Sequence, residues 1–193
     1  MRMKFNKDSL EHLLSDLGSL LKSRGERFEV VAIGGGSLLL LGLIDRPTRD
    51  IDLVGLIKDG VLRRAGPMPK ALEDAIHELA RLRNIDPHWM NAAPSQIAEQ
   101  GLPDGFLDRA TRREYGNLVI HLASRADQIC FKIYAAVDQG PDSKHAADLK
   151  TLLPTAEELA VAAHWARQQD PSPGFNEVLV QVLEAFGGTH ERS

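Results

Sequence analysis

The sequence predicts an α/β protein whose first part alternates strands with helices and whose last part is helical throughout. Apolar runs rich in β-branched residues, typical of buried strands, occur at 28–33, 51–54 and 118–122. From residue 124 onward, apolar residues recur only at helical spacing. We therefore expect an α/β core over residues 1–122, with helices flanking a small sheet, and a helical part over residues 123–193 that packs on it.

The spacing of apolar residues and the capping residues predict the helices. The first covers residues 9–22, with Asp8 or Ser9 as its N-cap. Residues 59–69 contain several glycines and prolines and are predicted to form a loop. Further helices are expected at 37–43, 70–82, 124–138, 143–152, 155–168 and 176–186, with short helices between 96 and 112.

The composition excludes several classes of function. A formal net charge of -4 supplies no global positive field that would draw the chain to nucleic acid or to an anionic membrane. The single cysteine, Cys130, excludes an internal disulfide and any multi-cysteine metal site, which fits a reducing compartment, so we expect the cytoplasm. No run approaches the roughly 20 apolar residues that a membrane-spanning helix needs.

Three glycines follow the first predicted strand and precede a predicted helix. Gly34, Gly35 and Gly36 lack a Cβ, so the backbone can approach an anion closely, and the N–H groups of the following helix point toward it. Ser37 is placed to add a hydroxyl. This turn is a candidate phosphate-binding site, and a tight strand-to-helix junction is the alternative.

Two aspartates flank one residue of the second predicted strand. Alternation along a strand places Asp50 and Asp52 on one face and Ile51 on the other. Such a pair suits Mg²⁺, which combines a few carboxylates with substrate phosphates. Arg46 and Arg49 precede the pair, where they would moderate carboxylate repulsion or meet phosphate oxygens. A solvated turn is the alternative, and the glycines upstream favour the metal site.

Competing motifs fail on individual residues. No Gly-Lys-Ser/Thr segment is present as a Walker-type loop requires, and Leu39 replaces the third glycine of a dinucleotide fingerprint. Val54 stands where an EF-hand loop needs an aspartate or asparagine. The sequence also lacks the His-Glu-x-x-His and Gly-x-Ser-x-Gly motifs of zinc proteases and serine hydrolases.

The spacing of the glycines and aspartates resembles a known superfamily. Gly35-Gly36, thirteen further residues and then Asp50-Ile51-Asp52 resemble the signature of polymerase-β-like nucleotidyltransferases. The resemblance implies their fold, a small mixed sheet flanked by helices.

A narrower resemblance extends further along the chain. The run through Leu41-Gly42 and residues 46–52 is similar to AbiEii-type proteins, the nucleotidyltransferase-like toxins of toxin–antitoxin pairs, and to their bacterial relatives. That group also has a lysine on a helix and a His/Asp-x-x-Asp-Leu element, matched here by Lys132 and by His145 with Asp148. The combined resemblance covers residues 29–153.

The resemblance implies transfer of a nucleoside monophosphate from a nucleoside triphosphate to an acceptor hydroxyl, with Mg²⁺ or Mn²⁺ as cofactor. It assigns Asp50 and Asp52 to the metal. It assigns Lys132 to the charge of the triphosphate and Asp148 to orienting that lysine. The triphosphate contacts are expected from Gly35, Gly36, Ser37 and Arg49.

Other features leave alternatives open. The superfamily usually adds a third carboxylate from a later strand, but the third predicted strand carries His121 and no carboxylate, so Asp86 and Asp148 are the candidates. Lys132 lies off the apolar stripe of its helix, where a lysine is normally solvated. Asp148 also lies one helical turn from Lys144, which offers it another partner.

The sequence leaves several candidates for the acceptor of the nucleoside monophosphate and for the partners of the protein. The acceptor candidates are a tRNA end, a protein side chain and a small molecule such as an aminoglycoside. An antitoxin protein is expected only through the resemblance, and no membrane partner is expected. The alternative function is a non-catalytic module that keeps the nucleotide pocket, or only the fold, and binds a partner protein. Asp50 and Asp52 favour the enzyme, and the missing third carboxylate favours the module.

Overall fold

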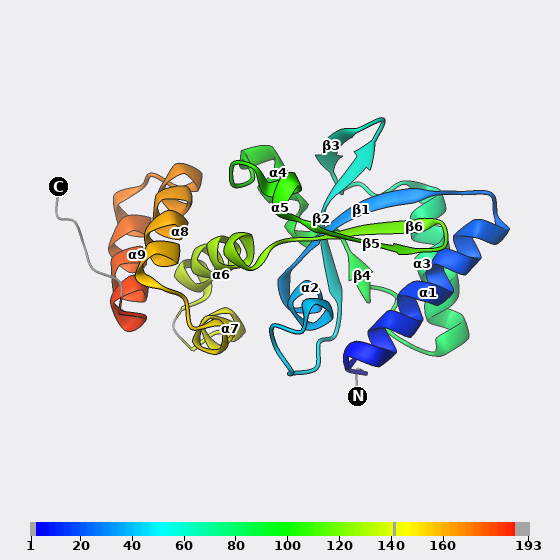
Figure 1. The fold of residues 1–193 in the computed structure, drawn as a ribbon, viewed down its shortest axis with the longest axis horizontal. Coiled ribbons are helices and arrows are strands. Elements are labelled where there is room, and N and C mark those ends of the chain that lie inside the picture. The colour runs from blue at the N-terminus through cyan, green and yellow to red at the C-terminus, as the bar shows by residue number, and fades with distance from the viewer. Residues whose placement is uncertain (1–2, 141, 188–193) are drawn as a thin grey trace. The chain divides into compact units, whose positions relative to one another are not determined.

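The computed structural model describes residues 3–140 and 142–187 (Figure 1). Residues 1–2, 141 and 188–193, which fall inside the two expected parts, lie outside the described residues. The chain divides into two compact units, Met1–Ala123 and Ser124–Ser193. The first unit is mixed α/β and the second is helical, so the predicted fold class is confirmed.

A mixed sheet of six described strands forms the core of the first unit. The strands are β1 (Phe28–Ile33), β2 (Ile51–Lys58), β3 (Val61–Arg64), β4 (Met90–Asn91), β5 (Thr111–Tyr115) and β6 (Leu118–Leu122). The order is β3-β2-β1-β6-β5, and β4 also pairs with β2. β1 is antiparallel to β2 and parallel to β6. Because β1 is central and almost wholly apolar, it fixes the position of the glycines that follow it.

Helices flank this sheet. They are α1 (Lys7–Ser23), α2 (Gly34–Leu41), α3 (Lys70–Arg83), the 3-10 helix η1 (Ala93–Gln96), α4 (Ile97–Gln100) and α5 (Phe106–Arg109). α1 packs against β5 and β6, α2 against β1 and β2, and η1 against β2. In Figure 1, α1 and α2 lie on one side of the sheet, and α4 and α5 lie on the other.

Several local predictions for this unit were wrong. α1 begins after Asn6, whose side-chain oxygen accepts the backbone N–H of Ser9 at 2.9 Å, so neither Asp8 nor Ser9 is the N-cap. The predicted loop at 59–69 contains β3, which forms a hairpin with β2 through Asp59 and Gly60, at φ 53° and 74°. Asp-Gly favours such a turn. The charged edge strand β5 was also not predicted, because its sequence has no apolar alternation.

The described residues of the second unit form four helices: α6 (Arg125–Gln139), α7 (Lys144–Leu152), α8 (Ala156–Gln169) and α9 (Pro173–Ala185). All four were predicted, with small shifts at their ends. Each begins after a serine or threonine whose side-chain oxygen accepts a backbone N–H of the first turn, namely Ser124, Ser143, Thr155 and Ser172. Nowhere in the described part of the chain is a helix both long and apolar enough to cross a bilayer.

Candidate functional site

The three glycines, Gly34 to Gly36, form the first turn of α2 directly after β1, so the predicted start of this helix at residue 37 was wrong; this segment is called the glycine turn. Gly34 opens the helix at φ 79°, a left-handed value that glycine adopts without strain. A Cβ on Gly34 would lie 2.8 Å from Asp52 Oδ2, and a Cβ on Gly36 would lie 2.7 Å from the backbone oxygen of Asp50. Both distances are shorter than normal contacts. The close approach of the turn to the aspartate segment therefore requires glycine at these two positions.

Asp52 lies in β2 with its carboxylate at the glycine turn. Its register partner in β1 is Ile33, the residue just before the turn. On the other edge of β2 its partner is Asn91 of β4, whose Nδ2 donates a hydrogen bond to Asp52 Oδ1 at 3.2 Å. Asp52 is half-buried, so a protein amide holds a carboxylate that stays partly exposed. The Asp52 carboxylate therefore lies against the glycine turn.

Asp50 precedes β2 by one residue and is half-buried. Its backbone oxygen accepts a hydrogen bond from Thr48 Oγ1 at 3.2 Å. The next residue, Ile51, is fully buried, and its N–H donates to the backbone oxygen of Trp89 at 2.7 Å. The strand therefore starts after Asp50, and the direction expected for the Asp50 side chain stays a prediction.

Among the two arginines before the aspartates, Arg46 is the one near the turn. A Cβ on Gly35 would lie 3.2 Å from Arg46 Nη2, whereas Arg49 is exposed. Ser37, in the first turn of α2, is completely buried, and its Oγ has no hydrogen-bond partner among the described residues. An unpaired buried hydroxyl costs free energy unless a partner is supplied.

In the second unit, Lys132 of α6 and Asp148 of α7 form a buried ion pair. Nζ and Oδ2 are 2.8 Å apart, and the side chains are 3% and 1% exposed. The alternative of a solvated Lys132 is wrong, because its side chain is buried, and Asp148 does not pair with Lys144 alone, because Lys132 is its partner. The contact that the resemblance implied between Asp148 and Lys132 is present.

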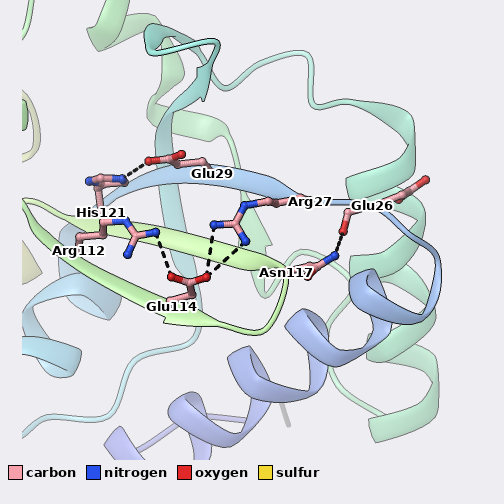
Figure 2. Close-up of polar contacts among 7 residues, drawn as sticks. All are labelled: Glu26, Arg27, Glu29, Arg112, Glu114, Asn117 and His121. Carbon is pink, nitrogen blue, oxygen red and sulfur yellow. Dashed lines mark hydrogen bonds and ion pairs between the residues drawn. The ribbon is translucent and has the colours of Figure 1, made fainter.

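The strands β5 and β6 carry a separate polar network (Figure 2). His121 Nε2 of β6 lies 2.6 Å from Glu29 Oε1 of β1. Glu114 of β5 accepts hydrogen bonds from two arginines, Arg27 and Arg112. These side chains pair with one another, so the described residues of β5 and β6 offer no third carboxylate to Asp52.

The neighbour of Asp52 is Asn91, which the sequence did not indicate. β4 has only two residues, too few for a periodic pattern, so only its pairing with β2 identifies it. Asp86, a candidate third carboxylate, lies in the turn before β4, where its Oδ1 accepts the backbone N–H of His88 at 2.9 Å. A neutral amide, and not a carboxylate, thus lies opposite Asp52 in β4.

The residues around the glycine turn fit a nucleotide with a divalent cation. Within residues 3–140 and 142–187, no group of three His, Cys, Asp or Glu side chains could hold a metal ion by itself. Two aspartates beside a phosphate-binding turn suit Mg²⁺, which completes its coordination with phosphates and water. The start of α2, opened by glycines, offers backbone N–H groups to an anion.

A mixed sheet with a glycine turn facing an aspartate strand is the arrangement expected of a nucleotidyltransferase. Residues 8–153 match the family described as nucleotidyltransferase of unknown function (DUF6036), and the chain belongs to this family. Neither the curated proteins nor the solved structures gave a significant match. The family match supports the superfamily, and the narrower similarity to AbiEii-type toxins stays a prediction.

Proposed function

We propose that this protein is a metal-dependent nucleotidyltransferase that moves a nucleoside monophosphate from a nucleoside triphosphate to an acceptor hydroxyl. The observation that carries the proposal is the contact between Asp52 and the glycine turn. A carboxylate for a cation and a backbone site for an anion meet there, as a nucleotide–metal complex requires. Membership of a nucleotidyltransferase family supports it independently.

In the proposed reaction, the acceptor oxygen bonds to the α-phosphorus while the bond from that phosphorus to the bridging oxygen breaks. Pyrophosphate leaves, and the acceptor proton passes to solvent. Mg²⁺ or Mn²⁺, when bound, neutralises phosphate charge and activates the acceptor oxygen.

The residues of the chain mainly position the reactants. Asp50 and Asp52 hold the cation. The backbone of Gly35 and Gly36 and the Ser37 hydroxyl contact the triphosphate, with Arg49 expected at its edge and Arg46 added by its closeness to Gly35. In the second unit, Asp148 orients the ammonium group of Lys132 through the 2.8 Å pair.

The acceptor and the biological role belong to the same proposal. The acceptor is a tRNA end, a protein side chain or a small molecule, and a mild net charge of -4 gives no global preference for nucleic acid. The similarity of residues 46–52 to AbiEii-type proteins favours a cytoplasmic toxin held by an antitoxin.

One observation favours a second candidate function, a non-catalytic module that acts through a protein partner. Asn91 occupies the strand position beside Asp52, and the described residues contain no cluster of three metal-binding side chains. A site with fewer carboxylates binds a cation less tightly, which suits a pocket that retains nucleotide without transfer.

A transfer assay tests the proposal. The protein is incubated with each labelled triphosphate, Mg²⁺ and total tRNA, cell protein or aminoglycosides, and transferred label is measured. Asp52→Ala is expected to reduce transfer at least about a hundredfold, because it removes a cation ligand. Asp74→Ala, at an exposed carboxylate of α3, is the matched control and should retain activity. Equal transfer by wild type and Asp52→Ala would contradict the proposal, and metal-dependent nucleotide binding without transfer would support the second candidate.

A further inference from the structure

The shortest strand of the sheet brings one side chain against Asp52. β4 runs parallel to the start of β2, with Met90 opposite Ile51 and Asn91 opposite Asp52. Residues opposite each other in paired strands point to the same face, so the two side chains are immediate neighbours. The hydrogen bond from Asn91 Nδ2 to Asp52 Oδ1, at 3.2 Å, follows from this register.

Both ends of the Asn91 amide are engaged. Its Oδ1 accepts the backbone N–H of Ala93 at 2.9 Å. Only an oxygen can accept that N–H, so Ala93 determines which way the amide is turned, and Nδ2 is left facing Asp52. Asn91 therefore presents its N–H group, and not its oxygen, to the Asp52 carboxylate.

Packing keeps β4 in place. Trp89 is fully buried, and its Nε1 donates to the backbone oxygen of Ile76 at 3.4 Å, while its own backbone oxygen accepts the N–H of Ile51 at 2.7 Å. Met90 is 1% exposed. Asn91 therefore extends from a two-residue strand that is held by buried packing and by backbone pairing with β2.

We propose that Asn91 is a positioning residue that fixes the Asp52 carboxylate at the glycine turn. As a neutral amide, it adds no third negative charge to the two aspartates. The inference rests on the proposed function, because it concerns the same cation site. A third carboxylate at position 91 would repel Asp52 without a cation, whereas the amide donates to it in the presence or absence of a cation. An amide at position 91 lowers the cation affinity compared with a third carboxylate. In return, Asp52 is already oriented before any ligand binds.

The first arm of the test examines the contact alone. In NMR spectra of isotope-labelled protein, the side-chain amide signal of Asn91 is expected to shift in Asp52→Asn. Asn117, whose Nδ2 donates to the backbone oxygen of Glu26 at 2.8 Å in the same unit, supplies a matched signal that should not shift. This arm needs neither cation nor nucleotide. An Asn91 signal that is unchanged in Asp52→Asn overturns the inference, even if Asn91→Ala fails to fold.

The second arm measures Mn²⁺ binding with a non-hydrolysable triphosphate, by electron paramagnetic resonance of the free ion. Asn91→Ala is expected to weaken binding about 10- to 100-fold, the usual effect of losing a residue that orients a metal ligand. Asn117→Ala should leave the affinity unchanged. In the Asp52→Asn background, Asn91→Ala should have little further effect, because it acts through Asp52.

The outcomes separate the two proposals. Equal losses from Asn91→Ala in both backgrounds indicate a merely structural role and overturn the inference. A shifted Asn91 signal with no Mn²⁺ binding by the wild-type chain leaves the contact standing and overturns the proposed function. Thermal unfolding of each variant checks that its fold is retained.

Discussion

Two charged clusters among the described residues, one in each unit, differ in how their charges are satisfied. In the first unit, Asp52 is half-buried, accepts one amide hydrogen bond from Asn91 and faces the glycine turn. In the second unit, Lys132 and Asp148 are almost completely buried and neutralise each other across 2.8 Å. The first carboxylate stays partly exposed to solvent, whereas in the second unit the two buried charges compensate part of each other's desolvation.

This difference predicts opposite responses to substitution. Loss of Asp52 should change ligand binding while leaving the free energy of unfolding nearly unchanged, because a partly exposed carboxylate is readily solvated. Loss of Lys132 or Asp148 should lower stability before any effect on function can be measured. The predictions below test this contrast.

The largest expected effect is on the stability of the second unit. Lys132→Met leaves Asp148 buried without its partner and is expected to lower the free energy of unfolding by about 3–5 kcal/mol. The double variant Lys132→Met/Asp148→Leu removes both charges and should recover most of the loss. Lys144→Met, at an exposed lysine of α7, is the control. Denaturant unfolding measures the free energy of unfolding of all three variants. If Lys132→Met lowered it by less than about 1 kcal/mol, as for a surface ion pair, the proposed difference between Asp52 and the buried pair would be contradicted.

A smaller effect is expected at the glycine turn. Gly34→Ala and Gly60→Ala both place a side chain at positive φ, 79° and 74°, and each should cost about 1–2 kcal/mol of stability. Only the Gly34 variant also pushes a Cβ against Asp52 Oδ2, whereas nothing lies within 4 Å of a Cβ at Gly60. Mn²⁺ titration should therefore reveal weaker binding, by about 10- to 100-fold, for Gly34→Ala alone. Equal Mn²⁺ affinities for the two variants would contradict a cation site formed by Asp52 at the glycine turn.

The smallest expected effect is confined to alkaline pH. Burial, together with a hydrogen bond to Glu11 of α1, raises the pKa of Tyr115 from 10.0 to about 12. The folded chain keeps this proton to a higher pH than the unfolded chain, so the stabilisation is complete below about pH 10 and is lost as the pH rises through about 12.

Urea unfolding across this range measures the effect. Tyr115→Phe should fall less steeply in stability than wild type above pH 10.0, the ordinary tyrosine pKa. Its Mn²⁺ affinity at neutral pH should be unchanged, because Tyr115 contacts α1 and not Asp52. Parallel pH profiles for the two chains would contradict the raised pKa.

Much of the fold was predictable because its signals are local. A few consecutive residues are enough to predict the β-branched strands β1 and β6 and the capped helices of the second unit. β4 and β5 do not, since a two-residue strand has no periodicity and a charged edge strand has no apolar alternation. Their existence depends on pairing with distant segments.

The same distinction holds for the site. The approach of Asp52 to the glycines was predictable because both lie in one short motif. The hydrogen bond from Asn91 was not, because it joins residues 39 positions apart through strand register. Burial of Lys132 was also unexpected from helical spacing, since the ion pair that stabilises the buried ammonium group joins it to Asp148 on another helix.

The account depends most on a nucleotide and a cation meeting between Asp52 and the start of α2. Crystals soaked with Mn²⁺ and a non-hydrolysable triphosphate test this directly through anomalous diffraction. The account predicts a manganese peak about 2 Å from carboxylate oxygens of Asp50 and Asp52, with phosphate density against Gly35 and Gly36. Phosphate density elsewhere, or bound triphosphate without manganese at the two aspartates, would contradict it.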